Sequence, residues 1–321
     1  MERIPHSLSP SSASVIFALV AGSQIACQRR GGVFYYTRHI LASKHLDPLL
    51  SGRMTSWAEY LCRGVHRGGA AALDAKPQVD ASMYPLGLNA PFLNLEGKEA
   101  ATVVADYTGR FENHGRDIAR AELDIIELLK EHAGLGPGKT VVDFGSGTGL
   151  FLRSLASSVQ PRGTVLATEI SAVFRDHLIR RVLAEEVLRS TVRVIYNNDG
   201  RDPLLTKQSV DVIFVCDVYH HLEYPLSVMR QFRSALRPGG RLVLIDFHRD
   251  KDIHKSHPDD PDWIFKHVRA GQAEFRNEIL SCGFELVCEP PCPFIPENYV
   301  MIFKSIELDQ VGAGWGTALP K

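Results

Sequence analysis

The sequence predicts an α/β fold built on a doubly wound, mostly parallel sheet. Short apolar runs recur through the second half of the chain, as expected for strands buried in a parallel sheet. Segments with apolar residues at helical spacing alternate with these runs. One run, 140–144, opens directly into a glycine-rich turn. Repeated strand–helix units form doubly wound sheets, which bind ligands at the carboxyl ends of their strands.

Apolar spacing gives the order of the elements. A helix is expected over 116–132, ended by a Gly-Pro-Gly turn. Five strands are then expected, at 140–144, 164–168, 192–196, 211–215 and 241–246. The helices between them are expected at 150–157, 172–188 and 225–236. A further helix at 271–282 precedes two more strands, 285–288 and 299–303.

The ends of the chain differ from this pattern. Residues 1–83 are interpreted as an N-terminal extension with a linker, because residues 1–85 show no sustained period apart from a short helix expected near 54–65. A single α/β domain is expected over 84–308. A Gly-rich flexible tail is expected at 309–321.

The N-terminal extension has an unusual charge pattern. Residues 3–46 contain no Asp or Glu, although Arg, Lys and Ser are frequent. This composition suits a mitochondrial or plastid transit peptide. The short apolar run 15–21 suits a secretory signal instead, and an untargeted cytoplasmic chain is the third alternative.

Composition excludes several classes of partner. The 36 Lys and Arg residues nearly balance the 37 Asp and Glu residues, so no nucleic-acid partner is expected. No run reaches the ~20 apolar residues of an integral membrane segment. The six cysteines are too few for a disulfide framework, and the trio Cys282, Cys288 and Cys292 lacks the spacing of a metal site.

The glycine-rich turn is the strongest local signal. Asp143 is followed by Gly145, Gly147 and Gly149, and a backbone without side chains lets a ligand approach closely. A nucleoside triphosphate, a dinucleotide and S-adenosylmethionine are the three plausible ligands.

The residues around the turn discriminate among these ligands. A triphosphate loop ends in Gly-Lys-Ser/Thr, whereas Gly149 is followed by Leu150. A dinucleotide turn needs a small residue at the position of Leu150, which disfavours a nicotinamide-dependent oxidoreductase. Asp143 would repel a pyrophosphate, but it would favour the α-ammonium group of S-adenosylmethionine.

Acidic residues at later strand ends extend the predicted cofactor site. Glu169 can accept hydrogen bonds from the ribose hydroxyls. Asp199 can accept from the adenine amino group, with Gly200 leaving room for the base. Asp217 is expected to face the methionine end of the cofactor or the border of the substrate.

Two adjacent histidines follow Asp217 where an acceptor molecule would lie. His220 or His221 is the candidate catalytic base, because a neutral imidazole with an ordinary pKa of ~6.5 can take a proton from a nucleophile. No metal site is predicted, since the sequence places no third ligand beside the pair. Tyr107, Phe111 and Arg116 are candidates for a lid, with Arg116 on the cofactor carboxylate. His267 lies with other histidines in a polar, Pro-bearing segment after the fifth strand, and such loops commonly contact substrate, although a solvated surface is the alternative.

These motifs jointly resemble the class I S-adenosylmethionine-dependent methyltransferases. The resemblance covers residues 84–305 and is carried by VVDFGSGTG, Glu169, NNDG, DVIFVCDVYHHL and LRPGGRLVLIDF. GLNAPFL, GRFENHGRD and KHVRAG are similar to a poorly characterised bacterial-type group, the small-molecule methyltransferases of type 11/25.

The resemblance implies a Rossmann-like seven-stranded sheet with an antiparallel last strand. It also implies S-adenosylmethionine as cofactor and methyl transfer to a small or medium-sized acceptor molecule. A catalytically silent S-adenosylmethionine-binding or assembly factor of the same fold is the alternative. The acceptor and the oligomeric state are not given by the resemblance.

Overall fold

The computed structural model describes three N-terminal strands and most of the chain from residue 89 to 306. The described residues are 16–20, 23–30, 33–40, 89–93, 95, 99–198, 200–254, 257, 259–260 and 262–306. The helix expected near 54–65, the tail expected at 309–321 and Asp199 lie outside them. The chain divides into two units, Met1–Val65 and His66–Lys321.

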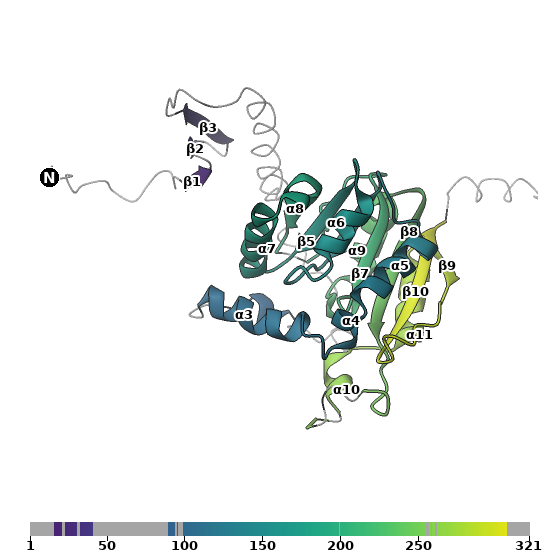
Figure 1. Cartoon of the computed structure of the whole chain (residues 1–321). Coiled ribbons are helices and arrows are strands. Elements are labelled where there is room, and N and C mark those ends of the chain that lie inside the picture. Colours follow the sequence, from purple (N-terminus) through teal and green to yellow (C-terminus); the bar gives the residue numbers. More distant parts are fainter. Residues whose placement is uncertain are drawn as a thin grey trace, which may run out of the picture. The chain divides into compact units, whose positions relative to one another are not determined.

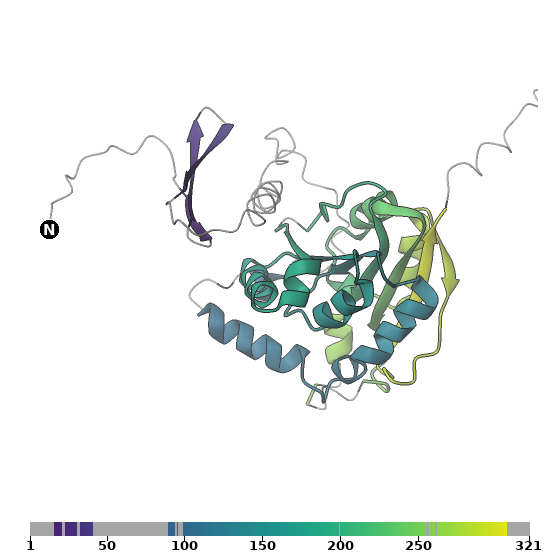
Figure 2. The same ribbon diagram turned by 45° about the horizontal axis from the view of Figure 1, so that its top comes forward.

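The first unit contains a three-stranded antiparallel meander (Figures 1 and 2). Its strands are β1 (Ile16–Val20), β2 (Ser23–Arg30) and β3 (Val33–Ile40). Because residues 1–85 show no sustained period, the sequence does not predict these strands. Their sequences lack the strict alternation of apolar and polar residues that indicates a half-buried strand.

The second unit is built on a seven-stranded sheet with strand order β6-β5-β4-β7-β8-β10-β9. The strands are β4 (Thr140–Phe144), β5 (Thr164–Glu169), β6 (Val192–Tyr196), β7 (Val210–Cys216), β8 (Leu236–Phe247), β9 (Phe284–Cys288) and β10 (Asn298–Ser305). Strand β10 runs opposite to the other six strands of this sheet and pairs antiparallel with both β8 and β9. The predicted Rossmann-like sheet with an antiparallel last strand is confirmed.

Helices cover both faces of this sheet. The described helices of this unit are α2 (Ala90–Leu93), α3 (Ala100–Phe111), α4 (Asp117–Arg120), α5 (Glu122–Ala133), α6 (Leu152–Val159), α7 (Ala172–Ala184), α8 (Glu186–Thr191), α9 (Pro225–Ala235), α10 (Trp263–His267) and α11 (Gln272–Ser281), with the 3-10 turn η1 (Tyr219–His221). Two helices that the sequence predicts as continuous are divided. Ala121 separates α4 from α5, and Glu185, with extended backbone, separates α7 from α8.

The core consists of two apolar layers, one on each face of the sheet. Helices α5, α6, α7 and α8 pack on the face that includes Val141 and Phe214, and α5 and α6 lie in front of the sheet in Figure 1. Helices α9 and α11 pack on the face that includes Val142 and Val215. Successive strand residues therefore enter opposite layers, which explains why the central strands read as unbroken apolar runs.

One helix offers a matched test of this packing. On α5, Leu129 is 0% exposed and Leu123 is 69% exposed. We expect Leu129→Ala to lower the free energy of unfolding by about 2–5 kcal/mol, because it leaves a cavity under the helix. Leu123→Ala should change it by less than about 0.5 kcal/mol. Urea denaturation of both variants measures the difference, and equal losses would contradict the described orientation of α5.

Candidate functional site

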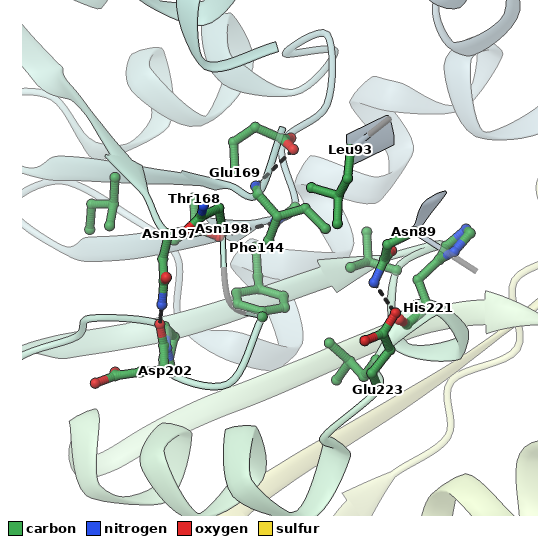
Figure 3. Close-up of a pocket in the computed structure, with 17 residues that line it drawn as sticks. Asn89, Leu93, Phe144, Thr168, Glu169, Asn197, Asn198, Asp202, His221 and Glu223 are labelled. Carbon is green, nitrogen blue, oxygen red and sulfur yellow. Dashed lines mark hydrogen bonds between the residues drawn. The ribbon is translucent and has the colours of Figure 1, made fainter. Parts of the chain in front are cut away.

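A pocket lies at the carboxyl ends of the central strands, where the strand order reverses between β4 and β7. Its walls come from the ends of β4, β5 and β6, from the segments after β6 and β7, and from α2 with the residue before it. The lining residues are Asn89, Leu93, Phe144, Gly145, Thr168, Glu169, Ile170, Ile195, Asn197, Asn198, Gly200, Asp202, Pro203, Val218, His221, Leu222 and Glu223. Figure 3 shows Glu169 at one side of the pocket and Asn89, His221 and Glu223 at the other.

The glycine turn forms part of the pocket wall and needs its glycines. Gly145, Gly147 and Gly149 have φ angles of 72°, 55° and 92°. Residues other than glycine rarely adopt such positive φ angles. A Cβ atom at Gly145 would also lie 2.8 Å from both γ-carbons of Val218. The turn therefore depends on glycine for its conformation and for its contact with the segment after β7.

Glu169, at the end of β5, is held rigidly against this turn. Its Oε2 accepts a hydrogen bond from the N–H of Gly147 at 2.9 Å. Its Oε1 accepts from Ile170 and Ser171, both at 2.8 Å, at the start of α7. Burial raises the pKa of Glu169 to about 7. A carboxylate has about four acceptor positions, so about one remains for a hydroxyl in the pocket.

Asp143 is a buried carboxylate with an unsatisfied oxygen. The side chain is 5% exposed, and its Oδ2 has no hydrogen-bond partner among the described residues. Burial raises the pKa of Asp143 to about 6. A buried acceptor without a donor is unfavourable, so this position beside the glycine turn suits a ligand that carries a positive charge.

Asp217 has partners within the protein. It has a φ of 51°, forms an ion pair with Arg116, and accepts a hydrogen bond from Asn298 Nδ2 at 2.6 Å. Burial raises the pKa of Asp217 to about 7. The guanidinium of Arg116 is bound to Asp217 in this structure, and its pairing with the cofactor carboxylate stays a prediction.

The two adjacent histidines have different surroundings. His220 is 1% exposed, and its Nδ1 lies 2.8 Å from Asp246 Oδ1. His221 lines the pocket, its ring packs edge-on against Phe92 at 5.4 Å, and its carbonyl accepts from Asn89 (Figure 3). Burial lowers the pKa of His220 to about 3 and that of His221 to about 2. The expectation of an ordinary imidazole pKa near 6.5 is therefore wrong for both rings.

Aromatic side chains ahead of β4 lie close to the glycine turn. Tyr107 contacts Phe92 at 5.4 Å, Phe111 at 5.3 Å and Phe174 at 5.3 Å between ring centroids. A Cβ atom on Gly147 would lie 3.6 Å from the ring of Phe111. Phe111 therefore lies next to the glycine turn, and the lid function of Tyr107 and Phe111 stays a prediction.

Residues 142–242 match the family described as a methyltransferase domain. The chain therefore contains a class I S-adenosylmethionine-dependent methyltransferase domain. A solved structure of a SAM-dependent methyltransferase from Aquifex aeolicus has the same fold, with a TM-score of 0.52, 20% identity, and coverage of 65% of this chain and 99% of that one.

Two curated relatives are methyltransferases of quinone biosynthesis. The ubiquinone/menaquinone biosynthesis C-methyltransferase of Ectopseudomonas mendocina is 28% identical over 123 residues, 37% of this chain and 46% of that protein. The ubiquinone biosynthesis O-methyltransferase of Xanthomonas campestris pv. campestris is 32% identical over 116 residues, 35% of this chain and 45% of that protein. The matches thus span less than half of each relative.

The residues present in the methyltransferase domain fit its cofactor, S-adenosylmethionine. The oxygen Oδ2 of Asp143, which has no hydrogen-bond partner among the described residues, suits the α-ammonium group, and Gly145 of the glycine turn lines the pocket. Glu169 lines the pocket with an acceptor position for a ribose hydroxyl. Gly200 and His221 line the pocket as well, whereas Asp143, Gly147, Gly149, Asp217 and His220 lie outside its lining.

Several residues of the site are absent from the sequence prediction. Asn89, Asn298 and Asp246 are not predicted, and His267 is predicted only as part of a polar segment that follows the fifth strand. Asp246 ends an apolar run as Asp143 and Glu169 do, so the same signal could have identified it.

In the described part of the chain, no helix combines the length and hydropathy needed to cross a membrane.

The glycine turn can be tested with two matched substitutions. Gly145→Ala should weaken S-adenosylmethionine binding by about tenfold or more, since the new methyl group meets Val218 and pushes the turn from its place. Gly134→Ala is the control, because Gly134 has a similar φ of 71° at the end of α5 but has no atoms within 4 Å of the added methyl. Calorimetry should show wild-type affinity for Gly134→Ala. Unchanged affinity in Gly145→Ala would exclude the turn from the cofactor site.

The raised pKa of Glu169 predicts opposite pH effects on stability and binding. Between pH 4.5 and about 7 the folded protein holds a proton that the unfolded chain has lost, so this group's contribution to stability falls as pH rises. A ribose hydroxyl needs the ionised carboxylate as acceptor, so cofactor affinity should fall below pH 7, by at most about tenfold per pH unit. Calorimetric titrations at several pH values measure this slope. The same slope in Glu169→Gln would assign it to another group.

Proposed function

We propose that this domain transfers the methyl group of S-adenosylmethionine to a small or medium-sized molecule. One observation carries the proposal: a single pocket joins the glycine turn and Glu169 to a second wall formed by Leu93, His221 and Leu222. The wall with the glycine turn and Glu169 has the groups expected to bind a cofactor. The wall with Leu93, His221 and Leu222 lies at the segment that follows β7, in a position for an acceptor.

The chemistry of this reaction explains the modest catalytic equipment of the pocket. S-adenosylmethionine supplies an electrophilic methyl group on a sulfonium sulfur. The protein has to hold both molecules in line and exclude water. Glu169 and Asp143 would orient the cofactor through its hydroxyl and ammonium groups. The rings of Phe92, Tyr107 and Phe174 form an aromatic cluster of α2, α3 and α7. This cluster would help to exclude water from that side of the pocket.

The pocket walls favour an acceptor that is partly apolar. Leu93, Pro203, Val218 and Leu222 give apolar surface beside the polar side chains of His221 and Glu223. The two quinone-biosynthesis relatives support a small-molecule acceptor, because their names describe methylation of such molecules. Of the two predicted catalytic histidines, we assign contact with the acceptor to His221, which lines the pocket.

The proposal predicts separate effects on turnover and binding. The full chain, incubated with radiolabelled S-adenosylmethionine and small-molecule fractions of cell extract, should label a discrete low-molecular-weight product. His221→Asn should lower turnover on that fraction by about 10–10²-fold while cofactor affinity stays nearly unchanged, because the acceptor would lose a contact that aligns it. Glu169→Ala should instead weaken cofactor binding by about 1.5–3 kcal/mol.

One control variant and two outcomes separate the alternatives. His132→Asn, on α5, should behave as the wild type, because His132 is outside the pocket lining. Tight cofactor binding without labelling of any fraction would favour the silent binding factor. Equal turnover in His221→Asn would exclude His221 from the acceptor site.

A further inference from the structure

Three histidines from two distant segments converge beside the pocket. His220 and His221 belong to η1, and His267 is the last residue of α10. One ring nitrogen of each lies within 4.8 Å of the other two. The Nε2 atoms of His220 and His267 are 3.2 Å apart. Among the described residues this is the one group of His, Cys, Asp or Glu side chains with such an arrangement.

We propose that His220, His221 and His267 form a binding site for a divalent transition-metal ion such as Zn²⁺, with a fourth position open toward the acceptor end of the pocket. Two imidazole nitrogens bound to a tetrahedral Zn²⁺ at 2.0–2.1 Å are about 3.3–3.4 Å apart. His220 and His267 already have nearly this separation. Only His221 needs to adjust, and its Nδ1 is buried without a hydrogen-bond partner among the described residues.

Asp246 fixes His220 in the orientation that a metal ligand needs. Its Oδ1 lies 2.8 Å from His220 Nδ1, and its two oxygens also accept from the backbone N–H groups of Phe247 and His220. A carboxylate at this position requires the proton on Nδ1, which leaves the lone pair on Nε2 facing His267. A carboxylate behind a ligating imidazole is the usual support of a metal-bound histidine.

The arginines near the three histidines are paired with carboxylates other than Asp246. Arg116 is paired with Asp217, and Arg269 is paired with Glu278. In the described part of the chain, Asp246 forms no ion pair with Lys or Arg, and its partner is the imidazole of His220. A dication bound to His220 would balance this buried negative charge.

Three protein ligands are typical of a catalytic zinc site, whose fourth position takes water or substrate. His221 lines the pocket, so this position lies at the acceptor wall. The assigned role rests on the proposed function. A hydroxyl or thiol acceptor held there loses its proton to water, and its lone pair forms the bond to the methyl carbon. The bond from that carbon to the sulfonium sulfur breaks, and its electron pair goes to sulfur.

Metal binding to the full chain tests the site without any acceptor. After treatment with a chelator, the wild type should bind one equivalent of Zn²⁺ in calorimetry, and Co²⁺ should give the visible absorption of a four-coordinate ion. Asp246→Asn should weaken binding by about 10–100-fold, and His267→Gln should weaken it by more than about 100-fold. His132→Gln, outside the cluster, is the matched control and should bind as the wild type.

The outcomes that would overturn the metal site differ from those that would overturn the proposed methyl transfer. Circular dichroism verifies the fold of each variant, and the cobalt spectrum of the wild type needs no variant at all. Absence of stoichiometric binding by the wild type, or full binding by a folded His267→Gln, would overturn the site. Methyl transfer that is equally fast before and after chelation would overturn the role of the fourth position.

Discussion

Four carboxylates buried along one edge of the sheet constrain the rest of this domain. Asp143, Glu169, Asp217 and Asp246 lie at or just after the ends of β4, β5, β7 and β8. All are nearly inaccessible to water, and burial raises the pKa of each to about 6 or 7. Charges in such a position are tolerated only with compensating partners. The loops around the pocket are arranged to provide those partners.

The compensation differs from one carboxylate to the next, and the differences separate their functions. Glu169 is held by backbone N–H groups, and Asp217 by Arg116 and Asn298. Asp246 supports an imidazole, whereas Asp143 keeps an oxygen without a partner. Asp217 is therefore a structural link between β7, β10 and the segment before α4. Asp143 and Asp246 are the two positions at which a ligand would complete the balance of charge.

Local sequence patterns were sufficient for the sheet and for the cofactor half of the site. An apolar run predicts a buried strand, and the residue that ends it lies at the carboxyl edge, so Asp143 and Glu169 were predictable without knowledge of packing. The glycine turn was predictable for the same reason, since its φ angles depend on the turn itself. The division of two long helices at Ala121 and Glu185 was not, because the apolar period continues across both breaks.

The features of the site that the sequence did not predict are contacts between residues far apart in the chain. Arg116 and Asp217 are 101 positions apart, and His220 and His267 are 47 apart. Periodicity assigns each residue to an element, but it does not show which elements pack together. The sequence therefore does not distinguish His267 from the other histidines of its polar segment. The contact between His267 of α10 and His220 of η1 distinguishes it in the fold. The low histidine pKa values have the same origin, because burial is a property of the assembled fold.

The hydrogen bond from Gly147 to Glu169 also determines which part of the pocket can move. This bond, with those from Ile170 and Ser171 to the same carboxylate, fixes the glycine turn to β5 and α7. The turn is thus a rigid floor, and a ligand meets it without the entropy loss of ordering a loop. Phe111 of α3 lies next to this floor at Gly147. If Tyr107 and Phe111 act as the predicted lid, ligand exchange depends on the segment ahead of the sheet, and its rate is separable from the chemistry at the strand ends.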